Sequence, residues 1–131
     1  MAKKVVSHLD LDVYARGYEA AMEIFRLSRA FPKEEQYALT DQIRRSSRSV
    51  CANIAEAWRS RRYQQAFINK LSVAEAESAE TQVWLQFAVD CGYLAAEDAR
   101  KLFRTYESII VTLVGMINHP ETWTITKRPP T

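Results

Sequence analysis

One long amphipathic helix is predicted between residues 31 and 62, and its three faces determine how the rest of the chain can pack. At about 100° per residue, the apolar side chains gather on one side, which we expect to face the core. This apolar face comprises Leu39, Ile43, Val50, Ile54 and Ala57. The side turned away from it is basic and comprises Arg44, Arg45, Arg48 and Arg59. Small or amide side chains suited to a close helix contact lie between the two, namely Gln42, Ser46, Ser49 and Asn53.

Few turn-forming residues interrupt the remainder of the chain. Its 131 residues include only three glycines and four prolines, whereas 47% are apolar. This composition predicts a few long elements rather than many short ones. We expect helices at about 11–30, 34–58, 61–91 and 95–117, with irregular tails at 1–10 and 118–131. Short connections between four such helices predict an all-α fold, an antiparallel up-down-up-down four-helix bundle that forms a single domain over residues 1–131.

Local signals place the ends of these helices. Asp10 and Ser60 are candidate N-caps for the first and third helices, and Pro32 suits the opening of the second. Gly92 is the expected residue just beyond the third helix, where glycine tolerates a left-handed backbone. The first helix has an apolar stripe at three- and four-residue steps, which we expect to face the core. The stripe comprises Leu11, Tyr14, Ala15, Tyr18, Ala21, Met22 and Phe25.

The third helix is apolar on two sides. One is a heptad seam that comprises Phe67, Leu71, Ala74, Ser78, Thr81, Leu85 and Ala88. The other, which we call the second face, comprises Val73, Ala76, Glu80, Val83, Trp84 and Phe87. A helix of a monomeric bundle needs only one apolar face. The second face therefore predicts a homo-oligomer, or else tails that fold over it. In the last ten residues, Trp123 and Ile125 are the candidates for pinning the tail to the body.

Charge is unevenly distributed, although the formal net charge is only +2. Residues 44–62 hold six arginines against one acid, and residues 71–98 hold six acids and no Lys or Arg. The candidate nucleic-acid-binding residues are Arg44, Arg45, Arg48, Arg59, Arg61 and Arg62. Guanidinium forks match phosphate oxygens, so these residues indicate sequence-tolerant contact with RNA or DNA. The alternative is a structural or protein-docking module in which the arginines form salt bridges with Glu75, Glu77 and Glu80. Trp58 and Tyr63 could stack on bases, although core packing is the commoner fate of aromatic side chains.

No catalytic constellation is present in the sequence. His8 lies in the N-terminal tail and His119 follows the fourth helix, and neither pairs with a suitable base or metal-ligand pattern. Cys51 and Cys91 are far apart in apolar helical patterns, which predicts reduced, buried thiols. We therefore expect a protein that is not an enzyme and needs no cofactor or metal. No apolar run approaches 18 residues, so we expect no membrane association and a soluble, cytoplasmic protein. No convergent polar cluster supports a small-molecule pocket.

A combination of residues along most of the chain resembles a known family. The first part of the pattern comprises Phe31, Pro32, Glu35, Tyr37, Leu39, Gln42, Ile43, Arg44, Arg45, Ser46, Ser49, Val50 and residues 53–56. The second part comprises residues 78–80, Leu85 and residues 92–94. The pattern is similar to that of the four-helix-bundle proteins of ribosomal RNA intervening sequences and of the accessory variability determinant of diversity-generating retroelements. The resemblance implies a bacterial homopentamer with a basic surface for nucleic acid and, in the retroelement members, for a reverse transcriptase. Ala57 and Ala76 stand where the family commonly has glycine.

Overall fold

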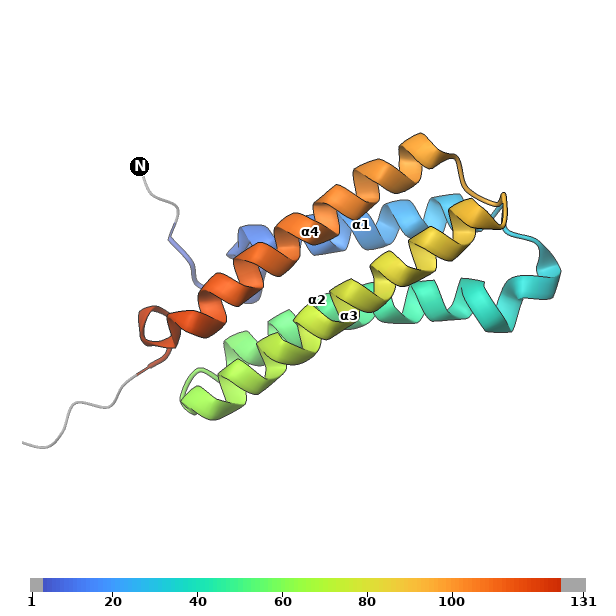
Figure 1. Ribbon diagram of the computed structural model, residues 1–131. Coiled ribbons are helices and arrows are strands. Elements are labelled where there is room, and N and C mark those ends of the chain that lie inside the picture. The colour runs from blue at the N-terminus through green and yellow to red at the C-terminus, as the bar shows by residue number, and fades with distance from the viewer. Residues whose placement is uncertain (1–3, 126–131) are drawn as a thin grey trace, which may run out of the picture.

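The computed structural model describes residues 4–125, and within them every regular element is helical. The four long helices are α1 (Asp12–Ser28), α2 (Asp41–Arg59), α3 (Gln64–Asp90) and α4 (Ala96–Asn118). Short helical turns precede or follow them, namely η1 (His8–Asp10), η2 (Lys33–Glu35), η3 (Gln36–Thr40) and η4 (Pro120–Thr122). The colour gradient of Figure 1 shows the chain reversing direction at each connection between long helices. The prediction of an all-α helical bundle is confirmed for these residues.

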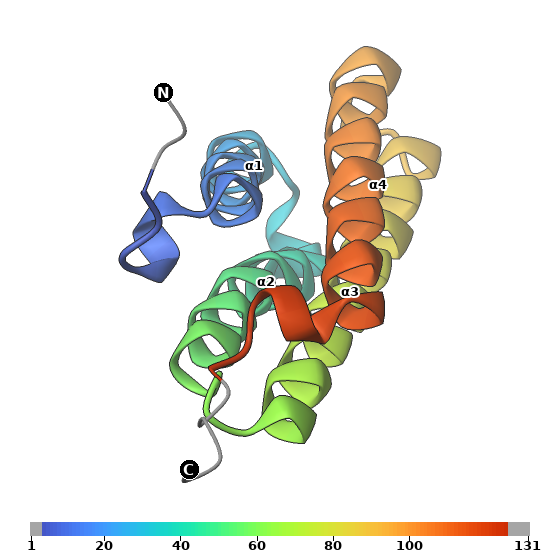
Figure 2. The same ribbon diagram turned by 90° about the vertical axis from the view of Figure 1, so that its left-hand side faces the viewer.

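The helices pack in the cyclic order α1, α2, α3, α4, so each contacts two neighbours. Figure 2 shows α1 and α2 on one side of the bundle and α3 and α4 on the other. The most extensive contact joins α2 to α3. There the hydroxyls of Ser46 and Thr81 lie 2.8 Å apart in a buried hydrogen bond. Small side chains at this point allow a close approach between the two helices, as expected for Ser46.

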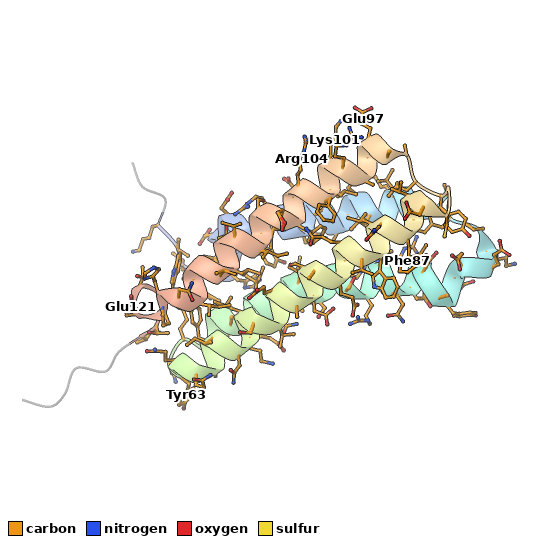
Figure 3. All side chains as sticks on the ribbon, viewed as in Figure 1. Tyr63, Phe87, Glu97, Lys101, Arg104 and Glu121 are labelled. Atoms are coloured by element: carbon orange, nitrogen blue, oxygen red, sulfur yellow. The ribbon has the colours of Figure 1, made fainter. Side chains whose placement is uncertain are left out.

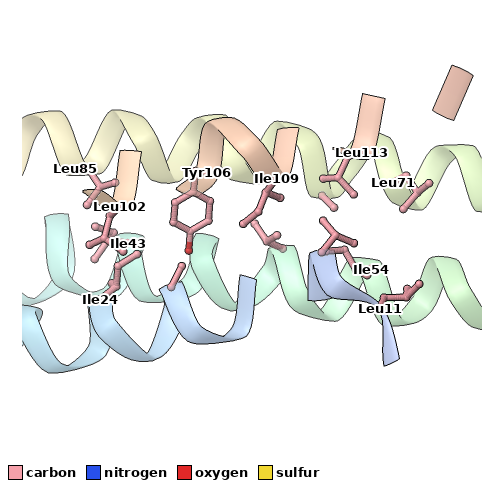
Figure 4. Close-up of a cluster of buried hydrophobic side chains, with 14 of the residues drawn as sticks. Leu11, Ile24, Ile43, Ile54, Leu71, Leu85, Leu102, Tyr106, Ile109 and Leu113 are labelled. Carbon is pink, nitrogen blue, oxygen red and sulfur yellow. The ribbon is translucent and has the colours of Figure 1, made fainter. Parts of the chain in front are cut away.

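The core contains the predicted apolar faces of α2 and α3. All five apolar residues of the pattern predicted for the second helix are buried, Leu39 in η3 and the other four in α2, and so are all seven of the α3 heptad seam. Figure 4 shows part of this cluster, to which Ile54 of α2, Leu71 of α3 and Leu113 of α4 contribute. Burial of large apolar side chains contributes about 1.5 to 3 kcal/mol each, so this cluster supplies much of the stability of the fold.

The apolar stripe predicted for the first helix is largely on the wrong side. The buried residues of α1 are Val13, Gly17, Ala20, Ile24 and Ser28. Tyr18 and Met22 are instead exposed, and Tyr14 and Phe25 are only partly buried. Gly17 faces α2 on this side, where a Cβ in its place would be in van der Waals contact with Sγ of Cys51 at 3.4 Å. The aromatic side chains of the predicted stripe are left at the edge of the contact between α1 and α2.

Several predicted helix ends differ from the structure. Ser7, not Asp10, caps η1, and Asp10 completes a capping box as its third residue. The second helix opens with the 3₁₀ turn η2 and the π-helical turn η3, so that α2 starts at Asp41 rather than near residue 34. Ser60 is the C-cap of α2, and α3 begins only after Tyr63.

Two further local predictions were confirmed and one was wrong. Gly92 has φ +81° and follows α3, and the Tyr93 N–H donates to the Ala88 carbonyl at 2.8 Å. In the tail, the Ile125 N–H donates to the Arg61 carbonyl at 2.9 Å and Trp123 packs against the core. Cys91, which was expected to be buried, is exposed, because it lies at the last turn of α3 beside the connection to α4.

Candidate functional site

Arg45 lies against the acidic side of α3. Its guanidinium pairs with Glu80 and approaches a Glu77 carboxylate oxygen to 3.3 Å. The hydrogen bond with Glu77 is the main reason why the pKa of Arg45 is raised. Glu80 also accepts a hydrogen bond from Nε1 of Trp84 at 3.3 Å. Arg45 therefore has the arrangement expected for the structural alternative, and Glu80 finds its arginine partner within its own chain.

Arg44 and Arg48 turn towards α1 instead. Both guanidiniums lie over the Phe25 ring, at 4.8 Å and 5.8 Å from its centroid. Arg44 also donates from Nε to the Ser28 hydroxyl at 2.8 Å. Arg29 of the α1 C-cap lies over the same ring at 4.6 Å. Three cations thus converge on one aromatic side chain, and we call Arg29, Arg44 and Arg48 the Phe25 cluster.

The other three arginines lie at the far end of α2. Arg59 and Arg62 are exposed. Arg61 stacks on the Trp58 ring at 3.5 Å from its centroid. It also donates from Nε to the Trp58 carbonyl at 2.7 Å, which gives a hydrogen-bond partner to one of the last carbonyls of α2. Burial, followed by the charge of Arg59, lowers the pKa of Arg61. Trp58 is buried in the core and Tyr63 is exposed, so only Tyr63 is open to stacking at this end.

The second face of α3 is only partly exposed, because Glu80 and Trp84 are partly buried and Trp84 packs against the core. The exposed fractions of Val83 and Phe87 are 45% and 54%, and Val73 and Ala76 are exposed as well. The Trp84 and Phe87 rings lie 6.0 Å apart. Figure 3 labels Phe87 on the side of α3 away from the labelled side chains of α4. The described part of the C-terminal tail, which ends at the Arg61 carbonyl, does not cover this face.

Within the described part of the chain, residues 4–125, no group of three or more His, Cys, Asp or Glu side chains is placed to hold a metal ion. None of the helices in this part of the chain has the length and apolar character needed to span a bilayer.

Comparison with known protein families shows the family of this chain. The model of the 23S rRNA-intervening sequence protein family matches residues 9–115. The chain belongs to this family. A crystal structure of a protein of unknown function from the S23 ribosomal protein family of Bacteroides thetaiotaomicron is similar to it, with 30% identity and a TM-score of 0.73. The match covers 81% of this intervening-sequence protein and 95% of the Bacteroides chain. No curated protein matches the chain.

Some residues that surround the arginines of this intervening-sequence protein were not identified from the sequence. Arg29 was missed because the charge count singled out residues 44–62, and Phe25 and Tyr18 were assigned to the core. A groove between α1 and α2 is lined by Tyr14, Tyr18, Ala21, Met22, Arg48, Cys51, Ala52 and Ala55. The spacing of Phe25 and Arg29, four residues apart on one helix, was the signal that could have placed them together.

Proposed function

We propose that this intervening-sequence protein is a non-enzymatic homo-oligomer that binds RNA or DNA through the arginines of α2 and of the turn after it, with little preference for sequence. The observation that carries the proposal is the state of Arg48, Arg59 and Arg62, which are exposed. Within residues 4–125, no carboxylate forms an ion pair with any of them. Guanidiniums without a carboxylate partner, on α2 and on the turn after it, are available to phosphate oxygens.

Assembly would multiply these contacts. The partly exposed second face of α3 is the surface on which we propose that copies associate, as a pentamer. Burial of Phe87 and Val83 between copies removes apolar area from water, which favours association. Each copy would add its own arginines, so weak phosphate contacts would sum by avidity. A chain with a net charge of only +2 can in this way present strong local basic patches.

A second candidate is favoured by Arg45 alone. Its ion pairs with Glu77 and Glu80 are what a structural or protein-docking module would use. Surface ion pairs contribute about 0 to 1 kcal/mol, so this pair orders the α2–α3 surface more than it stabilises the fold. If the remaining arginines serve the same purpose in contacts between copies, the protein binds no nucleic acid.

The test is a binding titration with labelled RNA and DNA of mixed sequence at about 50 and about 200 mM salt. For duplex DNA the log–log salt slope is about −0.9 per phosphate contacted. Arg48→Ala/Arg59→Ala should weaken binding and reduce the steepness of that slope by about one unit for each phosphate that is no longer bound. Arg100→Ala/Arg104→Ala removes the same charge from exposed positions of α4 and should change neither quantity by a comparable amount. Figure 3 shows Arg104 on the outer side of α4.

The absence of binding at the lower salt concentration, by protein of intact mass and helicity, would favour the structural candidate. An equal loss of binding in the two double variants would attribute binding to net charge and would overturn its assignment to the arginines of α2.

A further inference from the structure

The rotation of α1 leaves a row of aromatic side chains beside the arginines of α2. Tyr14 and Tyr18 are stacked with ring centroids 6.2 Å apart and an angle of 27° between their planes. The exposed fraction of Tyr18 is 53%, although the residue lies in an apolar pattern. Phe25 follows Tyr18 by seven residues on the same helix. Tyr18 and Phe25 therefore lie about 10 Å apart along α1, at about 1.5 Å per residue.

The groove beside this row is apolar and carries no acid. Its volume is about 410 Å³, and the residues of α2 that line it are Arg48, Cys51, Ala52 and Ala55. Small side chains on α2 opposite large rings on α1 give the groove its depth. Flat rings next to a groove of this size suit planar, apolar groups better than a rigid, cylindrical duplex.

Arg48 connects the groove to the Phe25 cluster, since it lines the one and belongs to the other. Within residues 4–125, no carboxylate forms an ion pair with Arg29, Arg44 or Arg48. Three guanidiniums that share one ring repel each other, and this repulsion is relieved when an anion binds among them. The face thus offers positive charge at one end and stacking surface at the other.

We infer that the α1–α2 face is a binding path for single-stranded nucleic acid, with bases stacking on Tyr18 and phosphates held by the Phe25 cluster. The inference rests on the proposed function and specifies its ligand as a single strand. Base stacking on aromatic side chains tolerates any sequence, because every base has a π-face, and arginines along the groove follow the backbone. In a duplex the bases are already paired and stacked, so a duplex can use the arginines but not Tyr18.

The path is separate from the proposed assembly surface. In the cyclic order of the bundle, α1 is diagonal to α3, and Figure 2 shows α1 across the bundle from α3. Substitutions at Tyr18 should therefore leave the α3 side of the interface intact, and light scattering of the Tyr18 variants separates an effect on binding from an effect on assembly.

The experiment compares the full-length wild type with Tyr18→Ala, using a labelled single-stranded RNA, the DNA strand of the same sequence, and the DNA duplex as probes. Wild type should bind the single strands more tightly than the duplex. Tyr18→Ala should weaken single-strand binding roughly 5- to 150-fold, the range expected for loss of one stacked base, and change duplex binding less than about twofold. Tyr18→Phe, which keeps the ring, should bind like wild type.

Tyr37→Ala is the matched control, because Tyr37 is an exposed tyrosine of η3 that does not line the groove. It should leave all three affinities unchanged. Light scattering and circular dichroism check that each variant keeps the mass and helicity of the wild type. Single-strand RNA and DNA affinities that fall together in Tyr18→Ala assign the site to stacking and backbone contact, and a loss confined to RNA assigns it to RNA alone.

The inference is overturned if Tyr18→Ala binds single strands as well as wild type does, or if Tyr37→Ala loses as much affinity. In that case, salt-dependent binding that is lost in Arg48→Ala/Arg59→Ala would still support the proposed function. Absence of binding to every probe would overturn both.

Discussion

At the scale of single residues, burial sets the chemistry of the two cysteines. Cys51 is buried between α1 and α2 and lies 3.4 Å from the position that a Cβ of Gly17 would occupy. Burial raises the pKa of the Cys51 thiol from its ordinary value of 9.0 to about 11, because the thiolate would lose its hydration. Cys91 is exposed at the end of α3. The two thiols should therefore respond differently to alkaline pH.

We expect the buried thiol to make stability fall at alkaline pH. Above pH 9.0 the unfolded chain loses the Cys51 proton while the folded chain keeps it up to about pH 11, so the unfolded state binds fewer protons. The stabilisation is present in full below pH 9.0 and is lost as pH rises through about 11. The free energy of unfolding should drop by about 2 to 3 kcal/mol over this window.

Urea denaturation at several pH values measures this drop. Other groups titrate in the same window, so the contribution of Cys51 is the difference between wild type and Cys51→Ala, whose curve should be flatter. Cys91→Ala should keep the wild-type slope. Parallel curves for wild type and Cys51→Ala would contradict the prediction.

At the scale of elements, the two exposed glycines play opposite roles. Gly92 ends α3 with φ +81°, whereas Gly115 lies within α4. A Cβ added at either position would meet no heavy atom within 4 Å. Only the backbone conformation therefore decides the outcome of a substitution.

Gly92→Ala should destabilise the protein by about 1 to 2 kcal/mol, since an L-residue is strained in the left-handed region. Gly115→Ala should stabilise it by about 0.5 to 1 kcal/mol, because alanine loses less backbone entropy in a helix. Thermal and urea unfolding of both variants measure the two shifts. Stabilisation by Gly92→Ala would show that α3 does not end as the structure has it, and destabilisation by Gly115→Ala would contradict the expectation for α4.

At the scale of the whole molecule, the second face of α3 is an apolar surface that the described residues leave partly exposed. Val73, Val83 and Phe87 are exposed on one side of a helix whose other side forms the core seam. Glu80 on this face is already paired with Arg45, so burial between copies would not leave its carboxylate without a partner. The face is therefore suited to self-association.

Phe87→Glu should weaken self-association by roughly 30-fold or more, because it places a charge in the centre of the proposed interface. Light scattering at micromolar concentration should show about 75 kDa for a wild-type pentamer, five times the 15.1 kDa of one chain, and a lower mass for the variant. Val111→Glu is the control, since Val111 is exposed on α4 away from that face. A wild-type mass of one chain would exclude the assembly.

The apolar periodicity of α2 and α3 and the turn at Gly92 could be read from the sequence, because three- and four-residue spacing and left-handed backbone are local properties. The arginine clustering could be read in the same way. The contacts that each arginine side chain makes could not be read from the sequence. Arg45 meets carboxylates 32 and 35 residues away, while Arg44 and Arg48 meet a ring on α1.

Only the tertiary structure decided how α1 is rotated about its axis. Its sequence offers two apolar sides, one with Tyr14, Tyr18, Met22 and Phe25 and one with Val13, Gly17, Ala20 and Ile24. Packing buries the second side, where the aliphatic Val13 and Ile24 fill the core and Gly17 faces Cys51 of α2. The aromatic row was thereby left beside the arginines of α2. That juxtaposition depends on the distance between two helices, which no local pattern within either helix specifies.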